Sequence, residues 1–169
     1  MNRIFDSSSL INLANGSLLE AILSIPGLKA QIGPQVRDEC ASIAPLLNAM
    51  IGVGSIEVLD DDDLPASLFF QLRNTYGLGP GETECLAFAS IGSQVVCCDD
   101  RAARSMIATE IGKKRVTGSL GLLIQAVHFG VIELVEAFAK YEKMRLSGGF
   151  LPAWTLEQFQ TEVSQFAAQ

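Results

Sequence analysis

The segment that most constrains the fold is Gln94–Cys98, a short apolar run bounded by Gly92 and Asp99. A short, β-branched run of this kind is typical of a buried strand in a parallel sheet. Other strand-like runs lie at residues 2–5, 55–59 and 115–117. Strands that alternate with helices form right-handed crossovers, which produce a largely parallel sheet. The chain is therefore predicted to be an α/β protein.

Helical segments fill the intervals between these strands. They are predicted over residues 7–24 (interrupted near residues 15–16), from Pro34 towards Met50, and over residues 65–76, 82–91, 101–111, 119–129, 133–145 and 155–168. No linker is long enough to divide the 169 residues, a length that suits one domain. We therefore expect a single domain over residues 1–169, with residues 133–169 as a C-terminal helical extension.

The composition excludes several classes of protein. Hydrophobic residues make up 49% and charged residues 18% of the chain, which argues against disorder. No apolar stretch reaches the roughly 18 residues of a membrane span, and residues 1–6 lack the apolar core of a secretory signal. We expect a cytoplasmic protein. A net charge of −7 argues against non-specific affinity for nucleic acid.

Two features concern metal and anion chemistry. No Cys-x-x-Cys pair exists and His128 is the only histidine, so a zinc site is poorly supported and the four cysteines are predicted to be reduced core residues. A local basic patch is predicted from five cations within fifteen residues: Arg101, Arg104, Lys113, Lys114 and Arg115.

Acidic residues beside apolar segments are the candidate functional groups: Asp6, Glu39, Glu82 and the pair Asp99–Asp100. Asp6 ends the first strand, and the aspartate pair ends the strand at residues 94–98. In an open α/β sheet, ligands bind outside the carboxyl ends of the strands, where the strand order reverses. Carboxylates gathered there repel one another unless a cation neutralises them. Oxygen-only ligands favour Mg²⁺ or Mn²⁺.

Each of these acids also has a purely structural interpretation. Asp6 suits a helix N-cap. Glu39 shares one helix side with Val36 and Ile43, and is nearer the buried stripe than Asp38. As an alternative, Glu39 is exposed at the helix edge or paired with an arginine.

The remaining junctions leave similar alternatives open. Glu82 and Glu84 both enter an apolar helix, where acids in the first turn complement the helix dipole, and periodicity does not choose between them. One of Asp99 and Asp100 suffices to cap the next helix, so a second acid indicates a site. Ser119 suits an N-cap, and the helix start there could also hold a phosphate.

Taken together, these segments resemble the PIN domain, the metal-dependent nuclease fold of the toxins in VapBC-type toxin–antitoxin pairs. The resemblance covers residues 6 to about 132. It rests on Asp6-Ser7-Ser8-Ser9-Leu10-Ile11, on residues 34–39, on Gly79-Pro80-Gly81-Glu82-Thr83-Glu84 and on Cys98-Asp99-Asp100-Arg101. Residues 118–123 and 148–150 match one uncharacterised PIN-like branch.

The resemblance implies a three-layer α/β/α fold with a mostly parallel twisted sheet, and hydrolysis of RNA phosphodiester bonds. It implies that Asp6, Glu39, Glu82 and Asp100 are the catalytic acids. Mg²⁺ or Mn²⁺ would be held by Asp6, Glu82, Asp100 and Asp99. Substrate contacts would come from Ser7, Arg101, Arg104, Thr117 and Ser119. An antitoxin partner and a homodimer are also expected from the family.

Two departures from the family pattern leave alternatives. The third acid is a glutamate where many PIN domains have aspartate, and Cys98-Asp99-Asp100 replaces Thr-x-Asp, a register that favours Asp100 over Asp99. The leading alternative is thus a PIN-like binding or regulatory module without activity that pairs with a small antitoxin-like protein. A phosphotransfer or phosphatase site on a flavodoxin-like sheet needs a second acid near the first strand, but residues 7–9 are all serine.

Overall fold

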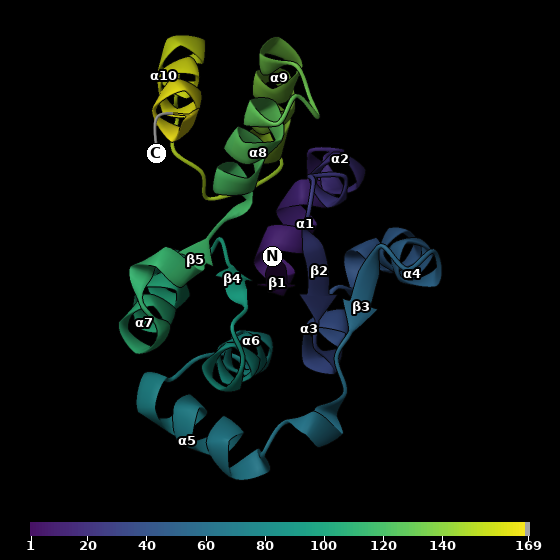
Figure 1. Ribbon diagram of the computed structural model, residues 1–169, viewed down its shortest axis with the longest axis vertical. Coiled ribbons are helices and arrows are strands. Elements are labelled where there is room, and N and C mark those ends of the chain that lie inside the picture. The colour runs from purple at the N-terminus through teal and green to yellow at the C-terminus, as the bar shows by residue number, and fades with distance from the viewer. Residues whose placement is uncertain (168–169) are drawn as a thin grey trace.

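Five parallel strands form one sheet at the centre of the molecule (Figure 1). The structure is a computed structural model that describes residues 1–167. The strands are β1 (Asn2–Phe5), β2 (Lys29–Ile32), β3 (Ile56–Val58), β4 (Val95–Cys97) and β5 (Val116–Thr117). Their spatial order is β3-β2-β1-β4-β5, and every neighbouring pair is parallel. The predicted α/β class with a parallel sheet is confirmed.

Helices cover the sheet in two groups, which gives a three-layer α/β/α arrangement (Figure 1). One group packs together from α1 (Ser7–Asn15), α2 (Leu19–Leu23), α8 (Ser119–His128), α9 (Leu134–Leu146) and α10 (Leu156–Ala167). The other consists of α3 (Pro34–Glu39), α5 (Ala66–Tyr76), α6 (Pro80–Ile91) and α7 (Arg101–Ile111). Helix α4 (Ala44–Gly52) lies beside β3. Short 3₁₀ turns occur at η1 (Ala41–Ile43), η2 (Asp61–Asp63) and η3 (Lys113–Arg115).

The core explains why α6 is apolar on nearly every side. Residues 83–89 of this helix are all buried, as are the side chains of β1 and β4 that lie against it. All four cysteines are buried and free, as the sequence predicts. Burial raises the pKa of Cys40 and of Cys97 to about 12, so these thiols stay neutral at physiological pH.

Strand β2 is the element that sequence patterning missed. Lys29-Ala30-Gln31-Ile32 is four residues long and half polar, so it lacks the apolar run that marks β4. Its pairing with β1 and β3 on either side fixes it as a strand, and buried Gln31 donates to Glu57 at 2.7 Å. Tertiary pairing, rather than local propensity, decides this segment.

The helix predicted from Pro34 towards Met50 is interrupted. Helix α3 ends at Glu39, and α4 starts only at Ala44 after the turn η1. Pro45 is consistent with the break, since it has no N–H for an intrahelical bond and is tolerated only in the first turn of a helix, where α4 places it. Consequently Glu39 is the last residue of its helix and is free to face away from the core.

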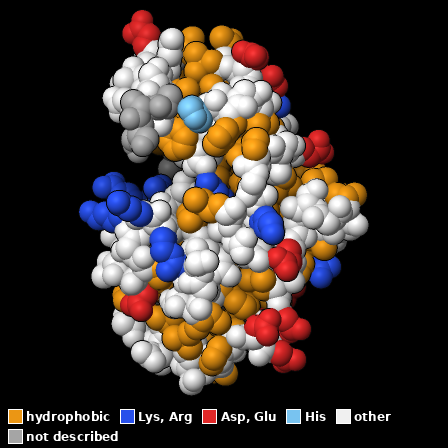
Figure 2. All heavy atoms as spheres, in the orientation of Figure 1, with side chains coloured by type: hydrophobic (Ala, Val, Ile, Leu, Met, Phe, Trp, Pro, Cys, Tyr) orange, Lys and Arg blue, Asp and Glu red, His pale blue; other side chains and the backbone are white. Residues whose placement is uncertain are grey.

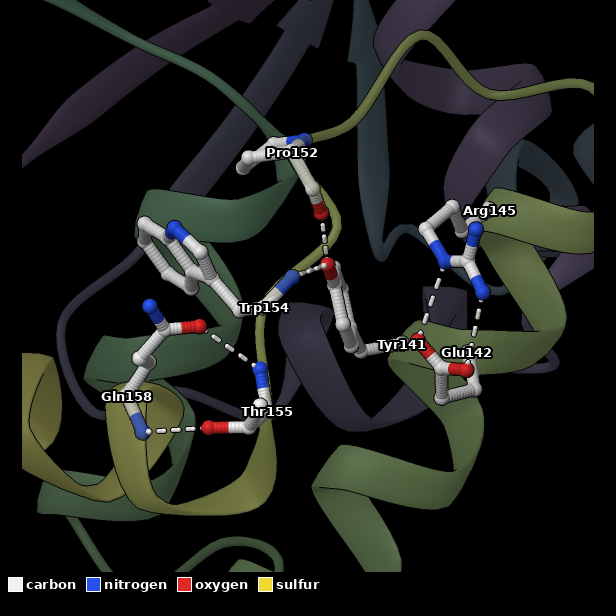
Figure 3. Close-up of polar contacts among 7 residues, drawn as sticks. All are labelled: Tyr141, Glu142, Arg145, Pro152, Trp154, Thr155 and Gln158. Atoms are coloured by element: carbon white, nitrogen blue, oxygen red, sulfur yellow. Dashed lines mark hydrogen bonds and ion pairs between the residues drawn. The ribbon is translucent and has the colours of Figure 1, made fainter.

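The C-terminal helices are joined through a buried tyrosine (Figure 3). The Tyr141 hydroxyl on α9 donates to the carbonyl of Pro152 and accepts the N–H of Trp154 at 3.0 Å. Thr155 and Gln158 then exchange hydrogen bonds of 2.8 and 3.3 Å, which cap the start of α10.

The division of the chain at residue 133 stays a prediction, as does the single domain. Within residues 1–167 no helix combines the length and the apolar character of a membrane span.

Candidate active site

The strand order reverses between β1 and β4, at the centre of the sheet. From β1 the chain moves outward to β2 and β3, and it then returns to place β4 on the other side of β1. Asp6 directly follows β1, and Asp99 and Asp100 follow β4. The sequence predicted this arrangement of acids at the ligand-binding edge of the sheet.

Asp6 is the most buried of these acids and caps α1. Its carboxylate accepts the N–H of Ser9 at 2.8 Å and the hydroxyls of Ser8 and Ser9, each at 2.7 Å. Only 1% of its surface is exposed. Burial raises the pKa of Asp6, while hydrogen bonds from Cys98, Ser9 and Ser8 act in the opposite direction. The structural interpretation of Asp6 as an N-cap is therefore confirmed, and its functional role stays a prediction.

Glu39 connects three elements of the site. Its Oε2 accepts the Ser7 hydroxyl at 2.7 Å, and its Oε1 accepts the N–H of Gly81 at 2.9 Å. The end of α3 is thereby joined to the starts of α1 and α6. Glu39 is exposed, rather than directed into the core as its helical spacing suggests.

Glu82 shows that the acids lie within electrostatic reach of one another. Burial raises the pKa of Glu82, and the charges of Asp100, Asp6 and Glu39 raise it further, whereas the N–H of Gly79, 2.9 Å away, lowers it. Four carboxylates from four different segments thus interact, and three of them raise the pKa of the fourth, Glu82. Repulsion of this kind is typical of sites that bind a cation or transfer a proton.

Asp99 and Asp100 have different surroundings. Asp99 accepts the N–H and the hydroxyl of Ser119, at 2.8 and 2.5 Å, and the side-chain amide of Asn12 at 2.7 Å. Asp100 caps α7 through Oδ1, which accepts the N–H of Ala103 at 2.7 Å. The hydrogen bonds of Asp99 therefore join it to α8 and α1, while the negative charge of Asp100 raises the pKa of Glu82.

Glu84 is an important acid whose role the sequence did not resolve. It is 1% exposed, and its carboxylate accepts the N–H groups of Gln35 and Val36 at 3.1 and 3.2 Å. It thus caps α3 from another helix, because the N-cap residue Gly33 has no side chain to do so. Because Glu84 lies two residues after Glu82 on the helix, its side chain points away from the acids at the switch point, the place where the strand order reverses between β1 and β4. Only the missing cap at Gly33 signals this role in the sequence.

The donor set fits a hard cation by its chemistry. The four acids offer carboxylate oxygens alone, and no hydrogen bond among residues 1–167 uses Oε1 of Glu82 or Oδ2 of Asp100. Within the same residues, no three His, Cys, Asp or Glu side chains are close enough to hold a metal ion directly. Carboxylate oxygens are the ligands that hard divalent cations prefer, and such cations keep part of their water shell where few protein ligands are in reach.

The predicted substrate-binding residues are distributed unevenly. Arg101 and Arg104 are exposed at the start of α7, Ser7 is half-buried beside Glu39, and Thr117 is half-buried at the end of β5. Ser119 is fully buried with its hydroxyl bound to Asp99, so it offers no surface to a substrate in this structure. Asp99, rather than Ser119, caps α8.

The predicted basic patch does not form one surface beside the acids. Arg115 donates to the backbone carbonyls of Ala89, Gly92 and Gln94, a structural role. Lys113 and Lys114 line a hollow at the amino ends of the strands, together with Met1 and Val95. Only Arg101 and Arg104 remain near the acidic edge.

Comparison with known proteins agrees with this architecture. A family model described as a PIN domain matches residues 2–165, nearly the whole chain. PIN domains are generally nucleases, a class of hydrolases, and generally use divalent metals. Among curated proteins and solved structures, none matches the chain. With its parallel sheet, its acids at the switch point and a family match of this length, the chain belongs to the PIN domain family.

Proposed function

We propose that this PIN domain is a metal-dependent endoribonuclease that hydrolyses RNA phosphodiester bonds. The proposal rests on the clustering of acids where the strand order reverses between β1 and β4. There the negative charges of Asp100, Asp6 and Glu39 all raise the pKa of Glu82. A set of mutually repelling carboxylates costs stability unless it serves a cation. The absence of histidine and available thiolates from this set favours Mg²⁺ or Mn²⁺.

In this proposal Asp6, Glu39, Glu82 and Asp100 hold one or two ions, partly through water, with Asp99 fixing the loop that carries Asp100. A bound divalent ion would lower the pKa of a water molecule and stabilise negative charge on the phosphate oxygens. Arg101 and Arg104 contact backbone phosphates and offset the acidic field. Ser7 orients Glu39 through the 2.7 Å hydrogen bond between them.

Cleavage of a labelled RNA panel with Mg²⁺, Mn²⁺ or EDTA tests this function. We expect a metal-dependent product from the wild type and none from Asp6→Asn, whose fold is retained because asparagine is also a good N-cap. Asp60→Asn is the matched control, since this exposed aspartate caps the turn η2 and is not one of the charges that act on the pKa of Glu82. Cleavage by Asp6→Asn at the wild-type rate would contradict the assignment.

We further propose that the protein is the toxin of a type II pair, with an antitoxin as partner and a homodimer as its own assembly. Exposed apolar side chains on α9 and just after it support an interface: Val135, Leu146 and Phe150 are 68%, 75% and 101% exposed. Light scattering of the purified protein tests the dimer, and a monomer at micromolar concentration would contradict it. If the metal titration gives no product from any RNA, the inactive binding module becomes the better proposal.

A further inference from the structure

A second candidate site lies at the opposite edge of the sheet from the acids. Near the amino ends of β1, β4 and β5 the surface encloses a hollow of about 710 Å³, a volume typical of small-molecule sites. Figure 2 shows Lys and Arg side chains gathered on the left side of the molecule, above α7. Three cations line this hollow: Arg3, Lys113 and Lys114.

Arg3 is the unusual member of this set because only 7% of its surface is exposed, yet it has no carboxylate partner among residues 1–167. Its Nη2 donates to Oε1 of Gln125 at 2.5 Å, and its buried Nε has no hydrogen-bond partner within residues 1–167. Gln125 is a neutral acceptor, so it does not compensate the charge. A buried guanidinium left uncompensated is strongly unfavourable, and an anion in the hollow would remove that penalty.

The walls of the hollow indicate what the anion carries. No Asp or Glu is among the described residues that line it, although the chain as a whole has a net charge of −7. The other walls are mainly apolar, and they include Pro26, Leu28 and the half-exposed ring of Phe129. Aromatic rings of this kind stack on planar bases. A cationic end and an apolar wall complement a phosphate and a base, respectively.

We propose that this hollow binds a nucleoside monophosphate or a close chemical relative, with Arg3, Lys113 and Lys114 at the phosphate and Phe129 at the base. The site is separate from the proposed nuclease site, because Arg3 lies at the start of β1 and Asp6 beyond its end. Arg3 and the two lysines supply the charge, and Gln125 orients the guanidinium through its hydrogen bond. Binding here requires no divalent metal.

Thermal unfolding with and without ligand tests the proposal. The probes are the four nucleoside 5′-monophosphates, inorganic phosphate and adenosine, all in EDTA and at matched ionic strength. We expect saturable stabilisation by at least one monophosphate, weaker stabilisation by phosphate and none by adenosine. Lys113→Ala/Lys114→Ala should weaken binding by about tenfold or more. Lys140→Ala/Lys143→Ala, which removes the same charge from α9, should bind as the wild type does.

Two further variants separate the possible explanations. Arg3→Met should abolish the response to ligand without lowering the unfolding temperature of the free protein, because it removes an uncompensated buried charge. If this variant does not fold, the lysine variants carry the test. Asp6→Asn should retain the monophosphate response, which distinguishes this hollow from the nuclease site. The proposal is overturned if no monophosphate stabilises the wild type, if adenosine or phosphate binds as tightly as the monophosphate, or if the lysine substitutions at residues 113 and 114 change nothing.

Discussion

The backbone N–H of Gly81 donates to Oε1 of Glu39 at 2.9 Å, and this bond joins the end of α3 to the first turn of α6. A Cβ added at Gly81 would lie 2.5 Å from Oε2 of Glu39, closer than side chains tolerate. The glycine therefore leaves room for the glutamate, and the hydrogen bond fixes its position. One short contact thus couples two of the acids at the switch point, since Glu82 follows Gly81 directly.

Gly81→Ala is expected to separate stability from activity. Alanine in a helix is favoured over glycine by about 1 kcal/mol, and the exposed Glu39 side chain can move aside. The free energy of unfolding should therefore be unchanged or slightly raised, while RNA cleavage falls by about tenfold or more as Glu39 is displaced. Denaturant unfolding and initial cleavage rates measure the two effects.

Gly52→Ala is the control for this experiment, because a Cβ added to this glycine at the end of α4 would meet no atom within 4 Å. It should leave cleavage at the wild-type rate. If Gly81→Ala also cleaves RNA at the wild-type rate, the present position of Glu39 is not required for cleavage.

The two adjacent aspartates should respond in opposite ways to substitution. Asp99→Ala leaves Asn12 and both donors of Ser119 without their acceptor, so we expect a loss of about 2–4 kcal/mol in the free energy of unfolding. Asp100→Asn keeps a side-chain oxygen for the N–H of Ala103 and should cost less than about 1 kcal/mol. Its RNA cleavage should nevertheless be lost. Equal stability losses in the two variants would contradict this division of roles.

Sequence patterning predicted the parts of the site that local rules control. Asp6 and Asp100 follow strands and precede helices, so their position at the carboxyl edge could be read from the order of elements. The elements that local patterns did not predict depend on residues that are distant in the sequence. Strand β2 exists because β1 and β3 flank it, and no local pattern in Lys29–Ile32 indicates this.

The same limit applies to side-chain roles. Asp99 and Asp100 are adjacent in sequence, yet one holds Ser119 and the other acts on Glu82, because successive residues after a strand point in different directions. Glu82 and Glu84 likewise share a helix turn but serve different partners. Only the packing of α3 against α6 shows that Glu84 caps a helix while Glu82 remains a candidate catalytic residue.

Glu84 should make the stability of the protein depend on pH. Burial, together with the charges of Asp61 and Glu39, raises the pKa of Glu84 to about 7, although the N–H groups of Gln35 and Val36 oppose the rise. The folded protein therefore binds a proton between the unfolded pKa of 4.5 and about 7 that the unfolded chain releases. This contribution is fully present below pH 4.5 and is lost as the pH rises through about 7.

Glu84→Gln removes this titration. Relative to the wild type, the variant should become more stable as the pH rises from 4.5 to about 8, by about 3 kcal/mol at most. Denaturant unfolding at several pH values measures the difference. Glu20→Gln, an exposed position in the first turn of α2, is the control and should run parallel to the wild type. A Glu84→Gln curve that is also parallel would show that the pKa of Glu84 is the same in the folded and the unfolded protein.

Tyr141 should determine whether the C-terminal helices stay docked. Its ring is fully buried and stacks on Phe159 at a centroid distance of 5.9 Å, while its hydroxyl bonds both Pro152 and Trp154. Tyr141→Phe keeps the ring but leaves the partly buried carbonyl of Pro152 and N–H of Trp154 without their partner, which costs about 1 kcal/mol. The segment between α9 and α10 should then be cut faster by a protease. Phe138→Leu is the comparison, since it changes an aromatic neighbour without removing a hydrogen bond. If Tyr141→Phe unfolds and is cleaved as the wild type is, the hydroxyl contributes nothing to docking, and the stacked rings alone hold α10 in place.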